Sequence, residues 1–227
     1  MIAPKRILIT GASKGIGFAL TKRLLSQGHS VIAVSRSTTD LELLAQKNDH
    51  LAVIRMDITE DLSPLVEHAK NLKIDHVVNN AGYLVNKSIL DHSDEEIFNQ
   101  FKVNVIAPMR IVRHLIPYLS DDASVCNISS MGGVQGSAKF PGLAAYSSSK
   151  GALSILSECM AEELKERNIR CNALALGAVQ TEMLESAFPG YEAPIQAAEM
   201  AEYIAEFVTV TSRFYNGKIL PVSVSTP

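Results

Sequence analysis

The sequence predicts a single α/β domain built on a doubly wound parallel sheet of about seven strands, with helices on both faces. Short apolar runs rich in β-branched residues alternate along the chain with longer segments in which apolar residues recur at helical spacing. The short runs are apolar throughout, as expected for parallel strands buried on both faces. No linker, repeat or change of composition divides the 227 residues, so one domain is expected over residues 1–227.

These two patterns give the elements in order. The expected strands are Arg6–Thr10, Ser30–Ser35, Leu51–Met56, Asp75–Asn79, Ser124–Ile128, Arg170–Leu176 and Lys218–Val224. The expected helices are Ile16–Gln27, Asp40–Gln46, Ser63–Asn71, Ser93 to about Leu119, Tyr146–Glu166 and Ala197–Val208.

Local signals support several of the helix boundaries. Gly28 closes the first helix, and Pro64 suits the first turn of the third. Ser93 and Glu96 have the spacing of a capping box, which starts the fourth helix. Pro108 predicts a kink within that helix.

Composition excludes several classes of function. The chain has 21 basic and 24 acidic residues, a net charge of −3, so no basic surplus indicates a nucleic-acid or membrane partner. The first apolar run breaks at Gly11, too early for a signal peptide, and no stretch is long enough to span a bilayer. The cysteines Cys126, Cys159 and Cys171 are odd in number and form no CxxC pair. The sequence therefore predicts a reduced, cytoplasmic setting, no disulfide framework and no metal site.

A glycine-rich turn follows the first strand and opens the first helix. Glycines there permit a tight turn and let backbone N–H groups approach a pyrophosphate at the helix N-terminus, where the helix dipole favours negative charge. The alternative is a plain helix-capping turn, but the position directly after the first strand of an α/β pattern favours dinucleotide binding. The candidate cofactor-binding residues are Gly11, Ser13, Lys14, Gly15, Ile16 and Gly17.

The GxxxGxG spacing of this turn resembles that of the short-chain dehydrogenase/reductase family, in its single-domain classical type. Five further motifs of that family occur in the family's order, so that the resemblance covers residues 6–183. They are the NNAG sequence of Asn79–Gly82, Asn104, the serine pair Ser129–Ser130, the YxxxK pair Tyr146 and Lys150, and Leu176–Thr181, in which leucine replaces the family's proline. The resemblance implies a Rossmann fold and a nicotinamide dinucleotide cofactor.

Tyr146 and Lys150 lie four residues apart and therefore project from one face of a helix. A phenol titrates near pH 10 in water, and an adjacent ammonium is expected to lower its pKa by favouring the phenolate. Such a tyrosine can protonate a nascent alkoxide or remove a hydroxyl proton in reverse. The resemblance further implies that Lys150 holds the nicotinamide ribose, that Ser130 hydrogen-bonds the substrate oxygen and that Asn104 orders a water molecule.

The resemblance also implies contacts beyond the glycine turn. Besides Tyr146 and Lys150, the implied cofactor residues are Asp57 and Ile58 near the adenine, then Asn80, Ala81, Gly82, Gly177, Val179 and Thr181. Ser130 is the preferred catalytic serine, with Ser129 as the alternative, because the loop between Ser130 and Tyr146 is longer than in typical relatives. That loop is expected to shape the substrate pocket, with Phe140 as a wall residue.

The end of the second strand predicts the choice of cofactor. An NAD site usually has an acidic residue there, which accepts a hydrogen bond from the ribose 2′-hydroxyl. This sequence has Ser35 and Arg36 instead, which suit a 2′-phosphate, and Lys14 offers a second cation. NADP(H) is therefore expected, with NAD(H) as the less favoured cofactor.

Together these observations predict an NADP(H)-dependent oxidoreductase that interconverts a carbonyl and a hydroxyl on a small organic substrate. The alternative is a non-catalytic dinucleotide-binding sensor; the longer epimerase relatives are disfavoured because the chain lacks their glycine spacing. The substrate stays open among ketones, aldehydes and steroid-like, pterin-like or acyl compounds.

A homodimer or homotetramer is expected through the two long helices, whose apolar residues cover more than the stripe of about 100° that one sheet face needs. In the second of them, the apolar stripe and the residues that widen it are Ala152, Ile155 and Cys159, then Leu153, Leu156, Met160 and Leu164.

Overall fold

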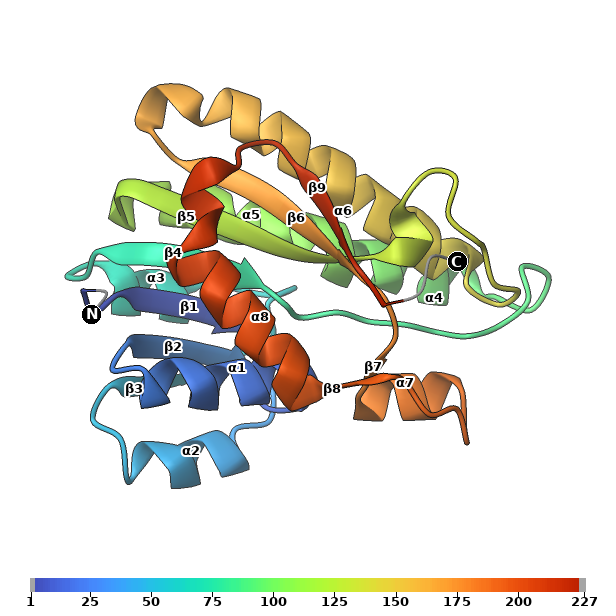
Figure 1. Cartoon of the computed structure of the whole chain (residues 1–227), viewed down its shortest axis with the longest axis horizontal. Helices are drawn as coiled ribbons and strands as arrows, with labels where there is room; N and C mark the ends of the chain where they lie inside the picture. Colours follow the sequence, from blue (N-terminus) through green and yellow to red (C-terminus); the bar gives the residue numbers. More distant parts are fainter. Residues whose placement is uncertain (1–2, 225–227) are drawn as a thin grey trace.

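The computed structural model describes residues 3–224 and is built on a seven-stranded parallel sheet (Figure 1). In spatial order the strands are β3 (Leu51–Arg55), β2 (Ser30–Ser35), β1 (Arg6–Thr10), β4 (Ile74–Asn79), β5 (Leu119–Ser130), β6 (Arg170–Leu176) and β9 (Ile219–Val222). The strand order reverses between β1 and β4. Strands β2 and β3 follow β1 on one side of it, and β4 then pairs with the other side of β1. In open α/β sheets such a reversal leaves a crevice at the carboxyl ends of the strands, where ligands bind.

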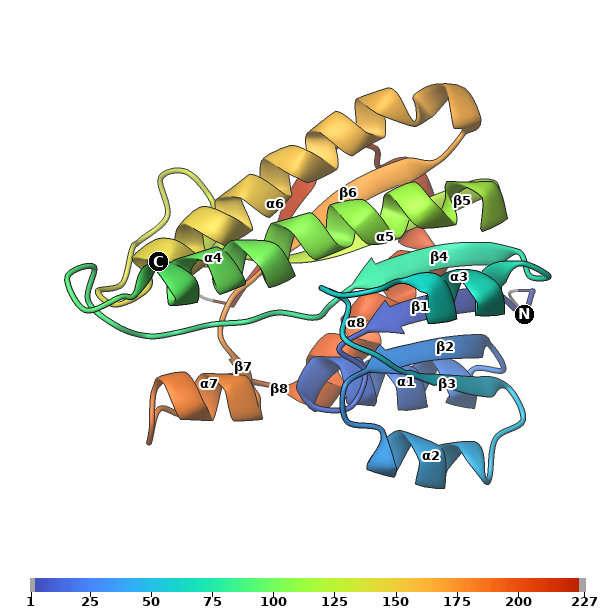
Figure 2. The same cartoon turned by 180° about the vertical axis from the view of Figure 1, so that it is seen from behind.

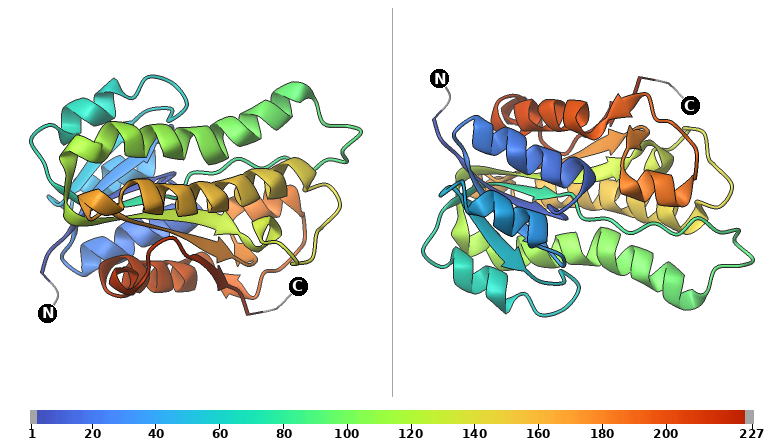
Figure 3. Two further views of the ribbon diagram at one scale, coloured as in Figure 1. Left: turned by 90° about the horizontal axis from the view of Figure 1, so that it is seen from above. Right: turned by 90° about the horizontal axis from the view of Figure 1, so that it is seen from below.

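Helices cover both faces of the sheet, as Figures 2 and 3 show. One face carries α1 (Gly15–Ser26), α2 (Thr39–Ala45) and α8 (Ala197–Thr209). The other carries α3 (Ser63–Ala69), α4 (Asp94–Phe101), α5 (Ala107–Leu115) and α6 (Ala144–Glu163). Alternate residues of one strand serve different cores: Leu8 of β1 packs on the α5–α6 side, whereas Ile7 and Ile9 pack on the α1–α8 side. The predicted doubly wound α/β fold is confirmed.

The expected long helix from Ser93 to about Leu119 is not one regular helix. The capping box of Ser93 and Glu96 starts α4, but Lys102–Ile106 forms a π-helical turn before α5 begins. The regular geometry is lost just ahead of Pro108, which has no N–H to donate to the carbonyl four residues earlier, that of Asn104. Leu119 does not end the helix as predicted: α5 ends at Leu115, a 3₁₀ turn from Ile116 to Tyr118 follows, and Leu119 begins β5, where it pairs with Ile74.

The segment after β6 contains elements that the sequence does not reveal. Here α7 (Glu182–Ala187) lies between two two-residue strands, β7 (Val179–Gln180) and β8 (Ile195–Gln196), which pair in parallel. Thr181 caps α7, its hydroxyl accepting from the Leu184 N–H at 3.2 Å. Figure 1 shows α7 projecting beside the carboxyl ends of the strands.

Strand β9 forms one edge of the sheet. The carbonyls of Lys218 and Val222 accept from Ala173 and Gly177 of the β6 segment. The backbone groups of the alternate residues, Ile219 and Pro221, therefore point to the open edge. None of the helices within the described residues combines the length and apolar character that a membrane span requires.

Candidate active site

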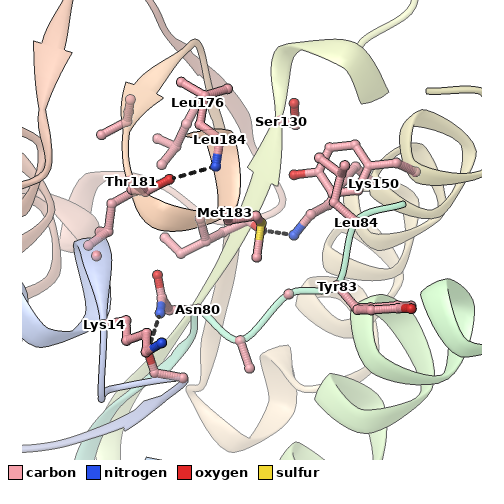
Figure 4. A pocket seen from close by; sticks show the side chains of 18 of the residues that line it. Lys14, Asn80, Tyr83, Leu84, Ser130, Lys150, Leu176, Thr181, Met183 and Leu184 are labelled. Carbon is pink, nitrogen blue, oxygen red and sulfur yellow. Dashed lines mark hydrogen bonds between the residues drawn. The ribbon is translucent and has the colours of Figure 1, made fainter. Parts of the chain in front are cut away.

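A cavity of about 630 Å³ lies at the carboxyl ends of the strands, at the reversal between β1 and β4. Its walls come from the glycine turn, the ends of β2 to β6 and the α7 segment. Figure 4 shows Lys14 and Asn80 on one side of it, and Ser130, Lys150 and Leu84 on the other. The two groups of motifs recognised in the sequence thus face one cavity.

The glycine turn presents bare backbone to the cavity. Gly11 and Gly15 have φ values of 65° and 49°, a conformation that side-chain-bearing residues rarely adopt. A Cβ on Gly11 would lie 2.7 Å from the Cα of Ala81, and one on Gly17 would lie 2.2 Å from the Gly11 carbonyl oxygen. Helix α1 begins here with neither a side-chain cap nor an acidic residue in its described first turn. This cradle fits a dinucleotide phosphate, which would accept from the uncapped N–H groups.

Asn80 fastens the end of β4 to the glycine turn. Its amide nitrogen donates to the carbonyls of Thr10 and Gly11 at 3.0 and 3.1 Å. The backbone N–H groups of Asn80 and Ala81 both donate to the Thr10 hydroxyl at 3.1 Å. These four bonds hold the two turns on either side of the strand reversal in a fixed relation.

Charged side chains gather where β2 and β3 end. Ser35 donates to Ser13 at 2.8 Å, and the Arg36 guanidinium, 79% exposed, lies 4.0 Å from Asp57. Burial works against ionisation of Asp57, but hydrogen bonds from Thr59 and the charge of Arg36 hold the pKa of that carboxyl below its usual value. Asp57 is therefore ionised at neutral pH, and Arg36 can leave this long, exposed contact for an anionic ligand at low cost.

The last three residues of β5, Ile128 to Ser130, contact α6 or line the cavity, depending on which way each group points. The Ile128 carbonyl accepts from Lys150 Nζ at 2.7 Å. The Ser129 hydroxyl is buried, donating to the Lys150 carbonyl at 2.9 Å and lying 2.9 Å from Ser154 Oγ. Ser130 points the opposite way, lines the cavity together with Tyr146, and accepts from the Gly132 N–H at 3.2 Å. Because side chains alternate along a strand, only Ser130 of this pair faces Tyr146.

The acid–base properties of the Tyr146–Lys150 pair differ from the sequence prediction. Burial raises the pKa of Tyr146 to about 12, which the hydrogen bond from Ser130 only partly offsets. Burial also lowers the pKa of Lys150 to about 8. The ammonium lies 5.8 Å from the centroid of the Tyr146 ring and donates to Ile128, so the expected lowering of the phenol pKa does not occur. Tyr146 is therefore a protonated phenol at neutral pH.

Asn104 lies at the π-helical turn, and its side chain is fully buried. Its amide nitrogen donates to the Tyr83 carbonyl and to Ser149 Oγ, both at 2.9 Å, and its amide oxygen accepts from the Tyr83 N–H at 2.8 Å. The side chain thus joins the segment after β4 to α6. A Cβ on Gly82 would lie 3.6 Å from both the Asn104 amide oxygen and Lys150 Nζ. The Asn104 amide and the Lys150 ammonium therefore both lie close to the backbone of Gly82.

Comparisons with known proteins agree with this geometry. The profile of the short chain dehydrogenase family matches residues 5–192. The chain belongs to this family. It is 34% identical to the uncharacterised oxidoreductase YvrD of Bacillus subtilis over 194 residues, covering 82% of this chain and 73% of that one. It is 33% identical to the NADPH-dependent pterin aldehyde reductase of Arabidopsis thaliana, covering 88% of each.

Among solved structures, the 3-ketoacyl-(acyl-carrier-protein) reductase of Brucella melitensis complexed with NADH superposes with a TM-score of 0.87 at 27% identity, over 96% of each chain. The chain is accordingly an oxidoreductase of the short-chain dehydrogenase family, with a site for a nicotinamide dinucleotide. These relatives include one named for NADPH and one complexed with NADH, so they leave the choice between the two cofactors open.

Most of the residues expected at a short-chain dehydrogenase site lie on the cavity wall. They are Gly11, Ser13, Lys14, Gly15, Ile16, Ser35, Arg36, Asp57, Ile58, Asn80, Ala81, Gly82, Ser130, Tyr146, Lys150, Gly177, Val179 and Thr181. The two others, Gly17 and Asn104, lie behind the wall, where Gly17 packs on Gly11 and Asn104 braces Tyr83.

The structure also brings in residues that the motifs do not include. Met183 and Glu182 of α7 line the cavity. A Cβ on Gly82 would lie 3.7 Å from Met183 Cε, and one on Gly15 would lie 3.5 Å from the Glu182 carboxylate. Helix α7 thus lies over both the Lys150 side and the glycine turn. Six residues of helix are too few to show an apolar period, so this contact has no signal in the sequence.

Proposed function

We propose that the protein is an NADP(H)-dependent oxidoreductase that interconverts a carbonyl and a hydroxyl on a small organic substrate, with Tyr146 as the acid/base. The observation that carries this proposal is the convergence of Ser130, Tyr146 and Lys150 on the cavity that the glycine cradle also faces. Family membership and the cradle's fit to a dinucleotide phosphate support it.

In the reductive direction, the protonated Tyr146 donates its phenolic proton to the oxygen of the substrate carbonyl. Ser130, which lines the same part of the cavity as Tyr146, holds the same oxygen within reach of the phenol. A bound nicotinamide dinucleotide would supply the hydride. The Lys150 ammonium can stabilise the phenolate that remains if it moves from the Ile128 carbonyl toward the ribose hydroxyls or the phenolate. In the oxidative direction, Tyr146 takes the proton back.

The preference for NADP(H) over NAD(H) rests on the end of β2. Ser35 and the exposed Arg36 stand where an NAD site usually has an acidic residue, and exposed Lys14 faces the same part of the cavity. The test compares kcat/KM for NADPH and NADH in wild type and Arg36→Ala, with Arg55→Ala as control because Arg55 is exposed but outside the cavity wall. We expect Arg36→Ala alone to lose the preference. Equal efficiency with NADH in wild type would overturn the assignment.

Turnover itself separates the enzyme from the alternative of a dinucleotide sensor. Oxidation of NADPH in the presence of a carbonyl compound, abolished in Tyr146→Phe, is the expected result. Tight NADPH binding with no turnover of any carbonyl compound would instead favour the sensor.

We also propose a homo-oligomer that pairs through α4, α5 and α6. Leu153, Leu156, Met160 and Leu164, which widen the stripe on α6, are buried in the core of the same chain. Other apolar residues stay open on this face: Phe98 is 72% exposed, Met109 47% and Ile155 58%. A patch of this kind is costly unless a partner covers it. Light scattering should give a multiple of 24.6 kDa, and the monomer mass would contradict the proposal.

A further inference from the structure

The substrate side of the cavity is enclosed by three segments that are far apart in the sequence. Asn86, in the segment after β4, donates from its side chain to the Ala187 carbonyl at the end of α7 at 2.8 Å. Lys87 donates from its backbone to the Gly142 carbonyl at 3.1 Å. Gly142 has φ 87°, and a Cβ there would lie 1.8 Å from the Asn86 amide oxygen. These contacts join α7, the segment after β4 and the long loop before α6 into one rim.

The walls inside this rim are apolar. The segment after β4 contributes Leu84, the long loop contributes Phe140 and Leu143, and the α7 segment contributes Leu184, Phe188 and Tyr191. Phe140 is 55% exposed and Tyr191 47%, although both line the cavity. Aromatic side chains that lie half-exposed on two facing segments of a pocket wall gain most from an apolar ligand between them.

Apart from Lys150, the charged groups of the described cavity wall lie away from these apolar walls. Among the described lining residues, the charged ones are Lys14, Arg36, Asp57, Lys150 and Glu182. The first three belong to the glycine turn and the ends of β2 and β3, and Glu182 lies beside Gly15. Lys150 donates to Ile128 beneath Tyr146. Lys139, in the long loop, is bound to its own loop through the Val134 and Ser137 carbonyls.

We infer that the substrate is an uncharged carbonyl compound carrying an aromatic or bulky apolar substituent. This inference rests on the proposed function. The carbonyl oxygen binds Ser130 and Tyr146, and the apolar substituent lies between Phe140 and the α7 segment. A carboxylate or phosphate next to the carbonyl would lose its hydration, and Lys150, the cation of the described wall near Tyr146, already donates to the Ile128 carbonyl. A polyhydroxylated sugar would leave its hydroxyl groups against apolar walls.

The test uses substrate pairs that differ at one substituent, with NADPH oxidation followed at saturating cofactor. Ethyl benzoylformate and benzoylformate share the aryl ketone, but the first carries an ethyl ester where the second carries a negatively charged carboxylate. Ethyl benzoylformate and ethyl pyruvate share the ester and differ in phenyl against methyl. We expect kcat/KM for ethyl benzoylformate to exceed kcat/KM for benzoylformate about 100-fold, because the apolar walls inside the rim offer the carboxylate no partner. The value of kcat/KM for ethyl benzoylformate should also exceed that for ethyl pyruvate at least about tenfold, because an apolar pocket discriminates to this extent between a large and a small apolar group.

A matched pair of variants locates the effect. Phe140→Ala should remove most of the phenyl-over-methyl preference, lowering kcat/KM for ethyl benzoylformate far more than kcat/KM for ethyl pyruvate. Phe214→Ala, which removes a phenylalanine that is 69% exposed and lies outside the cavity wall, should keep the preference. Efficient reduction of benzoylformate or xylulose, or a preference unchanged in Phe140→Ala, would overturn the inference and leave the proposed function standing. Failure to oxidise NADPH with every one of these compounds would overturn both.

Discussion

His76 should make the folded protein sensitive to mild acid. It lies on β4, 6% exposed, with Nδ1 2.8 Å from Ser124 Oγ and no hydrogen-bond partner for Nε2 among the described residues. Burial lowers its pKa from 6.5 to about 4; the charge of Asp75 opposes this, whereas Lys5 and Arg170 add to it. The neutral imidazole is therefore the form that the fold accommodates.

The magnitude follows from proton linkage. Between pH 6.5 and about 4 the unfolded chain binds a proton at this position and the folded protein does not, so the free energy of unfolding falls as the pH falls. Each unit of pKa difference is worth about 1.4 kcal/mol, which gives a loss of about 3 kcal/mol over the whole window. The contribution is fully present above pH 6.5 and is lost as the pH drops toward 4. Between pH 6.5 and 5 alone, about 2 kcal/mol should disappear.

Urea unfolding followed by far-ultraviolet circular dichroism at pH 7, 6 and 5 measures this, since the chain has no tryptophan to serve as a probe. The double variant His76→Leu/Ser124→Ala removes the titrating ring together with its partner, so neither polar group is left buried alone. Its free energy of unfolding should fall about 2 kcal/mol less than that of wild type between pH 7 and 5. Exposed His50, changed to Gln, is the control and should keep the wild-type slope. Equal slopes in wild type and the double variant would refute the reasoning.

Three further predictions concern the site. Tyr146→Phe should lower kcat by about 10²–10⁴-fold while NADPH affinity, measured by fluorescence titration, stays near wild type, because only the transferable proton is lost; retention of a tenth of the activity would argue against Tyr146 as the acid. Ser130→Ala should lower kcat at an unchanged melting temperature, whereas Ser129→Ala should cost about 1–3 kcal/mol of stability, because Ser129 is buried against α6; the reverse pattern in activity and thermal melting would exchange their roles. Gly17→Ala should abolish NADPH binding, since its Cβ would lie 2.2 Å from the Gly11 carbonyl oxygen, and calorimetric titration that found wild-type affinity would contradict this.

The sequence sufficed for the features that local patterns determine. Buried strands read as apolar runs, and the glycine turn follows from its place between β1 and α1. The choice between Ser129 and Ser130 could not be read from spacing, because the loop length before Tyr146 differs from the family pattern; it follows from which way each side chain points at the end of β5. The burial of Tyr146 could not be predicted from the sequence either. A spacing of four residues indicates that two side chains share a helix face, but it does not indicate how much solvent reaches them.

Helix α7 shows a different limit. It is short, its residues have no periodic pattern, and it is held by contacts to distant segments such as that between Asn86 and the Ala187 carbonyl. Its place over the cavity is a property of the assembled fold, so single-sequence patterns could not predict that Met183 and Glu182 line the site. The homo-oligomer, the cytoplasmic location and the lack of nucleic-acid partners stay predictions.

Pro221 has a consequence for how molecules of this protein meet one another. An exposed edge strand offers a row of free N–H and C=O groups on which a strand from another chain can add, which is a common start of aggregation. In β9 the backbone of Pro221 points to that open edge, and proline contributes no N–H there. A strand arriving from a second molecule would find its ladder interrupted after a single residue. The sheet therefore cannot be continued regularly at its β9 edge by a strand from a second molecule.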